Sequence, residues 1–265
     1  MNMRGKTIVV TGGGNGVGRE LVFQLLRKGV MVLAIDINEE ALMETKRMTG
    51  NDQNLFWYTV DIASKEDVFH FAEEAITKHG HIDGIVNNAG IIQPFVNVDS
   101  LSLERMEKVM NINYFGTLYM IKAFLPHLLK RPQAHIVNVS SMGGFLPVPG
   151  QTVYGSSKAA VKLLSEGLSS ELKNTNVKVS VVIPGGIATN IMKNSNITTR
   201  DKRDKEKGSN LILQPEEAAE LILRGMEKEK LVSYIGKDCK LMHLLMGIRP
   251  SLAKGLISRF RLTSN

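Results

Sequence analysis

Seven short runs rich in valine and isoleucine alternate with segments of helical periodicity, and this alternation constrains the fold more than any other feature. Such runs are typical of strands buried on both faces of a parallel sheet, where the crossover connections are helices. The predicted strands are Thr7–Val10, Val30–Ile35, Asn54–Val60, Ile82–Asn87, His135–Ser140, Lys178–Ile183 and Leu231–Ile235. The predicted helices span about 17–28, 39–48, 65–78, 102–129, 151–174 and 215–228. The sequence therefore predicts an α/β protein, a doubly wound parallel sheet of about seven strands with helices on both faces.

The chain is long enough for one large α/β domain. It has 265 residues, of which 43% are hydrophobic and 22% are charged, a composition typical of a globular protein with a full core. No repeat, low-complexity linker or break in composition marks a second domain, so residues 1–265 are expected to form a single unit. The polar stretch at about 190–213 is long for a loop and is expected to be a substrate lid. Residues from about 237 to 265 are expected to form a helical extension.

The formal net charge of +7 comes from two segments. Residues 200–207 carry a net charge of +2 and residues 237–265 carry +5, so the remaining body is neutral. Aromatic residues are not interleaved with these basic residues, as a surface that stacks bases requires, and we expect no nucleic-acid partner. The six histidines show no ligand pairing, so no metal site is predicted. A single cysteine, Cys239, and the lack of an apolar run long enough to span a bilayer favour a cytoplasmic location.

A glycine-rich turn follows the first predicted strand. It reads Thr11-Gly-Gly-Gly-Asn-Gly-Val-Gly18 and leads directly into a helix. Glycine permits left-handed backbone angles and close approach to a pyrophosphate, and the helix N-terminus offers N–H donors to the phosphates. Asp36 closes the second predicted strand, where a carboxylate can accept hydrogen bonds from an adenosine ribose. The sequence therefore predicts a dinucleotide site on a Rossmann-type sheet.

With three further motifs, this turn resembles the short-chain dehydrogenase/reductase family over almost the whole chain. The other motifs are Asn-Asn-Ala-Gly at 87–90, Tyr-x-x-x-Lys at 154–158 and Pro-Gly at 184–185. The resemblance implies an oxidoreductase that uses NAD or NADP. It places the cofactor contacts at Gly12, Gly14, Asn15, Gly16, Val17, Gly18, Asp36, Ile37, Asp61, Ile62, Asn88, Ala89, Gly90, Tyr154, Lys158, Pro184, Gly185, Ile187 and Thr189.

Tyr154 and Lys158 stand four residues apart, so a helix that starts near residue 151 places both on one face. A nearby cation favours the phenolate, which lets tyrosine take a proton from an alcohol. In the family, a serine at the position of Ser141 hydrogen-bonds the reacting oxygen, and an asparagine like Asn113 marks a bound water. The resemblance thus implies a catalytic set of Asn113, Ser141, Tyr154 and Lys158. Taken singly, each residue also fits a structural role, such as a helix cap or a core amide.

Cofactor and substrate preference follow from what surrounds these motifs. No lysine or arginine stands at Val17 or Ile37, where the resemblance would place a phosphate-binding base, and with Asp36 this favours NAD over NADP. Residues 142–149 are apolar and glycine-rich, which favours a small hydrophobic alcohol or ketone without naming it. Two alternatives stay open: a catalytically silent NAD-sensing or scaffold protein, and an epimerase or dehydratase on the same fold.

The C-terminal extension and the long helices bear on partners. Residues 241–246 are apolar nearly all round, and residues 252–261 combine an apolar helical face with basic residues. Such a segment can lie peripherally on an anionic membrane surface, or it can pack on the active site or a partner subunit, and packing is the favoured interpretation. The family pairs the helices at 102–129 and 151–174 across a two-fold axis, so a homodimer or homotetramer is expected.

Overall fold

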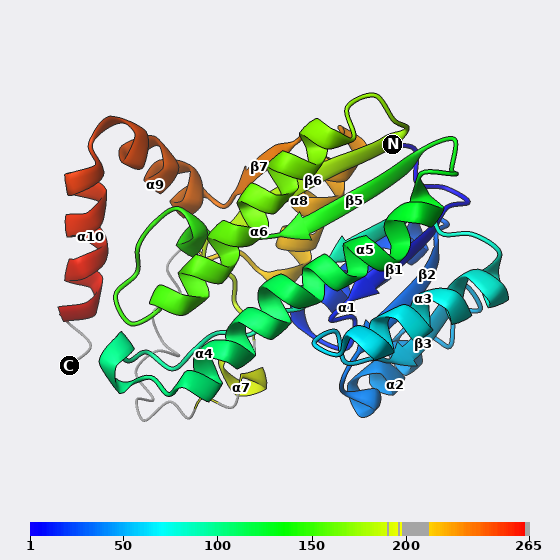
Figure 1. The fold of residues 1–265 in the computed structure, drawn as a ribbon, viewed down its shortest axis with the longest axis horizontal. Coiled ribbons are helices and arrows are strands. Elements are labelled where there is room, and N and C mark those ends of the chain that lie inside the picture. The colour runs from blue at the N-terminus through cyan, green and yellow to red at the C-terminus, as the bar shows by residue number, and fades with distance from the viewer. Residues whose placement is uncertain (190, 196, 198–211, 263–265) are drawn as a thin grey trace.

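The structure is a computed structural model that describes residues 1–189, 191–195, 197 and 212–262. Seven parallel strands form one sheet in the order β3-β2-β1-β4-β5-β6-β7, and the predicted doubly wound sheet is confirmed (Figure 1). The strands are β1 (Thr7–Thr11), β2 (Met31–Asp36), β3 (Leu55–Thr59), β4 (Gly84–Asn87), β5 (Ala134–Val139), β6 (Val177–Pro184) and β7 (Val232–Ile235). Most of the predicted lid at 190–213 lies outside the described residues.

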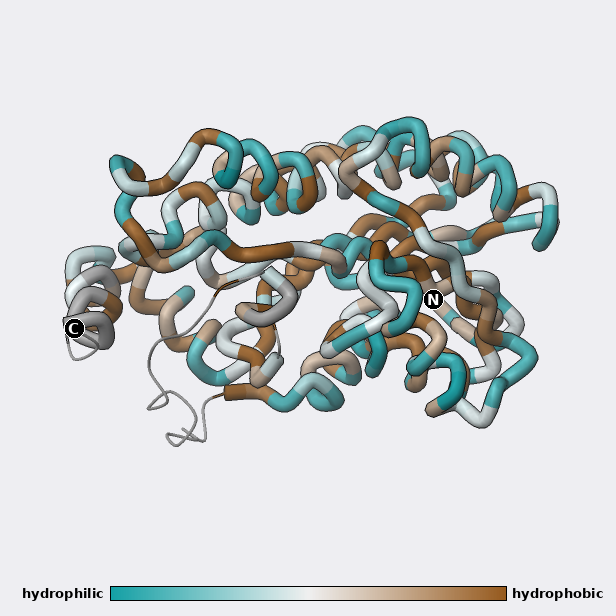
Figure 2. Tube along the Cα trace, turned by 90° about the horizontal axis from the view of Figure 1, so that it is seen from below, coloured by the Kyte–Doolittle hydropathy of each residue, from teal (hydrophilic) through white to brown (hydrophobic). Residues whose placement is uncertain are grey.

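Helices cover both faces of the sheet because successive strand residues point to opposite sides. Ile8 and Val10 belong to one buried cluster, which includes side chains of α1 (Gly16–Arg27), α2 (Glu39–Met48) and α8 (Pro215–Glu227). Val9 belongs to a second buried cluster on the opposite face, with side chains of α3 (Lys65–His79), α5 (Gly116–Leu128) and α6 (Thr152–Glu171). Figure 2 shows hydrophobic strand segments between helices with many hydrophilic residues.

The long helix predicted at 102–129 is interrupted. It consists of α4 (Leu103–Met110), a π-helical turn at Asn111–Phe115 and α5. A π-helical turn inside an α-helix is rare and is often found at a functional site. The turn contains Asn113, whose side chain is fully buried.

The chain ends in two helices beyond the sheet. These are α9 (Lys237–Ile248) and α10 (Pro250–Leu262), and Figure 1 shows them at the end of the molecule remote from α2 and α3. Short helical segments precede them at η1 (Val98–Ser100), η3 (Met142–Gly144) and α7 (Ile191–Asn194). Among the residues the structure describes, no helix has the length and apolarity needed to cross a membrane.

Candidate active site

The glycine-rich turn joins the end of β1 to the start of α1. Gly12 and Gly16 have φ angles of +70° and +52°, values that favour glycine. A Cβ atom at Gly18 would clash with the carbonyl oxygen of Gly12, so the turn can approach α1 this closely only with glycine there. The backbone thus forms a cradle at a helix N-terminus that fits a pyrophosphate.

Asp36 lies beside this turn at the end of β2. Its Oδ2 accepts a hydrogen bond from the Gly14 N–H at 3.1 Å, and its Oδ1 accepts one from the Asn38 N–H at 3.1 Å. These bonds orient the carboxylate, and each oxygen keeps a lone pair for another donor. Ile37 is 66% exposed next to it. The arrangement suits the hydroxyl groups of a ribose.

Two further loops meet the glycine-rich turn. The Thr11 hydroxyl oxygen accepts hydrogen bonds from the N–H groups of Asn88 and Ala89 at 3.0 and 2.9 Å, which holds the end of β4 against the turn. A Cβ at Gly16 would lie 3.5 Å from Thr189 Cγ2, so the loop after β6 also comes close. Three of the segments predicted to bind the cofactor, namely the turn and the loops after β4 and β6, therefore converge at one edge of the sheet.

Two predicted cofactor residues have roles in the structure that the sequence did not indicate. Ile62 is 8% exposed and belongs to a buried cluster, because the missing side chain of Gly116 leaves room for it. At Gly185, the space that a side chain would fill is occupied by the carboxylate of Asp238. Both residues therefore have a packing role, and their contacts with a cofactor stay a prediction.

The predicted catalytic residues come together in two pairs. A Cβ at Gly143 would lie 3.6 Å from Ser141 Oγ and 3.5 Å from Tyr154 Cε1, so these side chains border the same small space. A Cβ at Gly90 would lie 3.2 Å from Lys158 Nζ and 3.0 Å from Asn113 Oδ1. Because Tyr154 and Lys158 lie one turn apart on α6, the two pairs are neighbours.

Hydrogen bonds fix Lys158 at its side-chain nitrogen and at its backbone carbonyl. Its Nζ donates a hydrogen bond to the Val139 carbonyl at 2.9 Å, and its own carbonyl accepts one from the Ser140 hydroxyl at 2.7 Å. Only 5% of the residue is exposed. Burial lowers the pKa of its ammonium from 10.5 to about 8, because a charge is unfavourable away from water.

Tyr154 departs from the expectation of a lowered pKa. Burial raises the pKa of its phenol, and a hydrogen bond with Ser141 lowers it by a smaller amount. Desolvation of the phenolate therefore outweighs its stabilisation by the serine hydroxyl.

The side-chain amide of Asn113 forms hydrogen bonds with other residues of the protein. Its Oδ1 accepts a hydrogen bond from the Ile91 N–H at 2.9 Å, and its Nδ2 donates to the Ile91 carbonyl at 3.0 Å and to Ser157 Oγ at 2.9 Å. These bonds tie the π-helical turn to the loop after β4 and to α6. The role of a water-binding residue stays a prediction.

Gln93 contributes to this site, and the sequence did not single it out. Its Oε1 accepts hydrogen bonds from the N–H groups of Val153 and Tyr154 at 2.9 and 3.0 Å, the second and third residues of α6. Its Nε2 donates to the Gly150 carbonyl at 2.9 Å. Gln93 is fully buried and caps the helix that carries Tyr154. No local pattern reveals it, because helix caps are normally adjacent in sequence.

The loop after Ser141 packs against the C-terminal helices. Phe145 and Leu146 share a buried cluster with Met242 of α9 and Ala253 of α10. Phe145 also contacts the His243 ring edge-to-face, with 5.5 Å between ring centroids. The packing expected of the extension is therefore present on its inner face.

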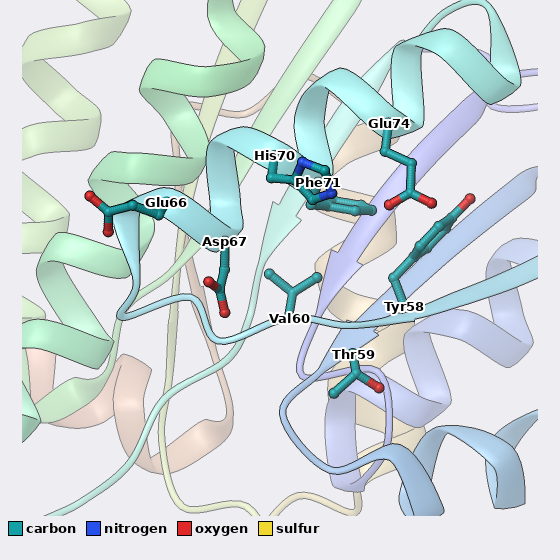
Figure 3. A pocket seen from close by; sticks show the side chains of 8 residues that line it. All are labelled: Tyr58, Thr59, Val60, Glu66, Asp67, His70, Phe71 and Glu74. Atoms are coloured by element: carbon teal, nitrogen blue, oxygen red, sulfur yellow. The ribbon is translucent and has the colours of Figure 1, made fainter.

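A separate pocket of about 300 Å³ lies between β3 and α3. Figure 3 shows its side chains, which include Tyr58, His70 and Glu74. None of the predicted site residues lines this pocket. It is distinct from the edge where Ser141, Tyr154 and Lys158 meet.

Comparison with known proteins agrees with this geometry. The family model for short chain dehydrogenase matches residues 6–200, and the chain belongs to this oxidoreductase family. A Mycobacterium tuberculosis protein that carries the name oxidoreductase SadH is 31% identical over 266 residues, covering 97% of this chain and 95% of its own length. An uncharacterized oxidoreductase of Staphylococcus saprophyticus is 34% identical over 206 residues, covering 77% and 88% of the two chains.

Solved structures share the fold. A short chain dehydrogenase from Burkholderia cenocepacia in complex with NADP has a TM-score of 0.81 and 26% identity, covering 97% of this chain and 99% of its own. A Burkholderia phymatum enzyme in complex with NAD also has a TM-score of 0.81, with 23% identity and coverage of 88% and 90%. Because the first was solved with NADP and the second with NAD, a nicotinamide dinucleotide is supported for this fold without a preference between them.

Proposed function

We propose that the chain is an NAD-dependent dehydrogenase or reductase that interconverts an alcohol and a ketone or aldehyde. The observation that carries this proposal is the meeting of Ser141 and Tyr154 around Gly143, with Lys158 one turn further along α6. This group lies at the same edge of the sheet as the glycine-rich turn, since the carboxyl ends of parallel strands meet at one edge. A proton donor, a hydrogen-bond donor and a cation thus surround one reacting position.

The residues present fit a nicotinamide dinucleotide. The positive φ angles of Gly12 and Gly16 shape the phosphate cradle, and Asp36 offers its carboxylate to the ribose. Thr189, close to Gly16, would hold the nicotinamide carboxamide, as the family resemblance implies. When bound, this cofactor supplies the hydride acceptor or donor.

The side chains of the site divide the proton chemistry. Tyr154 gives its phenolic proton to the carbonyl oxygen in reduction and takes a proton from the alcohol in oxidation. Ser141 donates a hydrogen bond to the reacting oxygen as charge develops there. Lys158 supplies a cation one helical turn away, and Asn113 holds the adjoining loop through Ile91.

The preference for NAD rests on charge. Asp36 would repel a 2′-phosphate, and the neighbouring Ile37 and Val17 offer no positive charge in its place. A hydrophobic substrate is supported by the apolar segment that follows Ser141, where Met142 and Phe145 are only partly buried by packing against the cluster of α9 and α10. Neither residue provides a partner for a carboxylate or phosphate.

We also propose a homodimer or homotetramer in the cytoplasm. Leu163 of α6 is 72% exposed and Phe115 is 38% exposed, which leaves apolar surface on the helices expected to pair. Other apolar residues of the same helices are buried in the monomer and do not support it, namely Val109, Ile121, Val161 and Leu168. The thiol of Cys239 is buried and donates to the Ile183 carbonyl at 3.1 Å, which suits a reducing compartment.

A cofactor-absorbance screen of apolar secondary alcohols and ketones, each with NAD and with NADP, tests the function. With the best substrate, Tyr154→Phe is expected to lower the rate by a factor on the order of 10² to 10⁴, whereas Tyr119→Phe on α5 serves as the matched control and should stay near wild type. Turnover of Tyr154→Phe within a few-fold of wild type would reject Tyr154 as the acid–base residue.

The same screen addresses the catalytically silent alternative. A silent protein would bind the dinucleotide, seen as a fluorescence change on titration, yet would turn over none of the substrates. The convergence of Ser141, Tyr154 and Lys158 speaks against it, because a protein that only senses NAD has no use for a placed proton donor.

A further inference from the structure

The outer face of the C-terminal helices is apolar and basic. On α9, Leu241, Leu244 and Ile248 are 53%, 58% and 68% exposed. Their spacings of three and four residues place them on one side of the helix. Leu252, at the start of α10, is 48% exposed. We call these four residues the apolar stripe.

The exposed charged residues of the described part of the extension are basic. Lys237, Lys240 and Arg249 are exposed next to it. The only acidic residue in 237–265 is Asp238, whose Oδ2 accepts a hydrogen bond from the Gly186 N–H at 2.7 Å and whose Oδ1 is buried. The acid is thus turned inward, and the exposed charges that the extension itself places near the stripe are positive.

The inner face of the same helices is already covered. Met242 and Ala253 are 8% and 0% exposed and pack with Leu146. Cys239 is also buried, against Ile183. Covering the active-site loop therefore accounts for the inner residues of the extension and leaves the apolar stripe unexplained.

We propose that the apolar stripe docks on an anionic lipid bilayer. An apolar face with basic residues at its border is the pattern of helices that lie in a membrane surface, where leucine enters the acyl boundary and lysine stays with the anionic headgroups. A second copy of the chain fits less well. In a two-fold contact the same patch faces itself, so the basic residues of both copies would meet without an acid between them.

Vesicle co-sedimentation of the full-length protein tests this proposal. The protein is expected to bind vesicles of phosphatidylcholine with phosphatidylglycerol, to bind pure phosphatidylcholine far more weakly, and to be released by salt, which screens the basic contacts. The measurement needs neither cofactor nor substrate, so it succeeds or fails independently of the proposed enzymatic activity.

Variants locate the contact. Leu244→Glu with Ile248→Glu should weaken binding by a factor on the order of ten or more. Replacing Lys237, Lys240 and Arg249 by glutamine should weaken binding to anionic vesicles roughly fivefold for each side chain. The matched control for the apolar variant is Leu129→Glu with Leu231→Glu, which changes exposed apolar residues elsewhere. The matched control for the charge variant replaces Lys130, Lys173 and Lys230 by glutamine. Both control sets should bind like wild type.

The outcomes separate the possible partners of this face. Absence of binding to anionic vesicles by the native protein overturns the proposal, as does binding that the stripe variants leave unchanged. A loss of oligomeric mass in the Leu244→Glu, Ile248→Glu variant, seen by light scattering without any vesicle binding, would assign the face to a second copy instead.

Discussion

The substitution Gln93→Met tests whether a residue far away in sequence sets the start of the catalytic helix. Methionine keeps a similar length and shape but removes both amide atoms. The N–H groups of Val153 and Tyr154, at the second and third positions of α6, then lose their acceptor. The Gly150 carbonyl loses its donor. The substitution thus removes the helix cap and leaves three polar groups without their hydrogen-bond partner.

The expected cost follows from these three groups. Loss of a helix cap costs about 0.5–2 kcal/mol, and a buried polar group left unpaired costs about 1–3 kcal/mol. Because Val153 and Tyr154 are only partly buried, water can satisfy some of the loss, and we expect a destabilisation of about 2–4 kcal/mol. Displacement of Tyr154 relative to Ser141 should also lower kcat more than it changes KM.

Thermal and denaturant unfolding at one protein concentration measure the change. Gln93→Glu keeps acceptor oxygens at the N-terminus of α6 and should lose less stability than Gln93→Met. Gln53→Leu, at an exposed position, is the control for removing a glutamine amide. A Gln93→Met protein within about 0.5 kcal/mol of wild type would refute the claim that Gln93 caps α6 in a way that matters for stability.

Three further outcomes are expected. Asp36→Ala should narrow the difference between NADH and NADPH affinity in fluorescence titration, because the carboxylate that repels a 2′-phosphate is removed. Tighter binding of NADPH than of NADH by the wild-type protein would contradict this explanation. The pKa of Lys158 is lowered from 10.5 to about 8, so the folded protein binds fewer protons than the unfolded chain between these values and its stability rises with pH there. Lys158→Met should remove that rise, on the order of 2 kcal/mol, in unfolding curves at about pH 7 and pH 10. Leu163→Glu should lower the oligomeric mass in light scattering, and a wild-type monomer at micromolar concentration would rule out the proposed assembly.

The sheet and the convergence of its motifs could be predicted because both follow from local rules. Runs such as Ile8–Val10 identify buried parallel strands, and the carboxyl ends of parallel strands meet at one edge. Thr11, Asn88 and Ser141 are therefore brought to the same side once the strands are assigned.

Features that depend on contacts between distant segments could not be predicted. At Gly185 the motif predicts a cofactor contact, which stays a prediction, but nothing in the motif indicates that the Asp238 carboxylate occupies the space of the missing side chain. The rise in the Tyr154 pKa depends on burial, which a motif does not encode. Likewise, the apolar residues of the extension could be recognised in the sequence, but only packing divides them into a covered face with Met242 and an exposed one with Leu244.

The segment Ile91–Gln93 explains how these distant contacts act together. Asn113 pairs with both backbone groups of Ile91, Arg105 of α4 donates to the Ile92 carbonyl at 2.6 Å, and Gln93 caps α6. Three consecutive residues thus connect α4, the π-helical turn and the catalytic helix. Groups that share one rigid junction do not contribute independently, so the position of Tyr154 is a property of the junction as well as of its own helix.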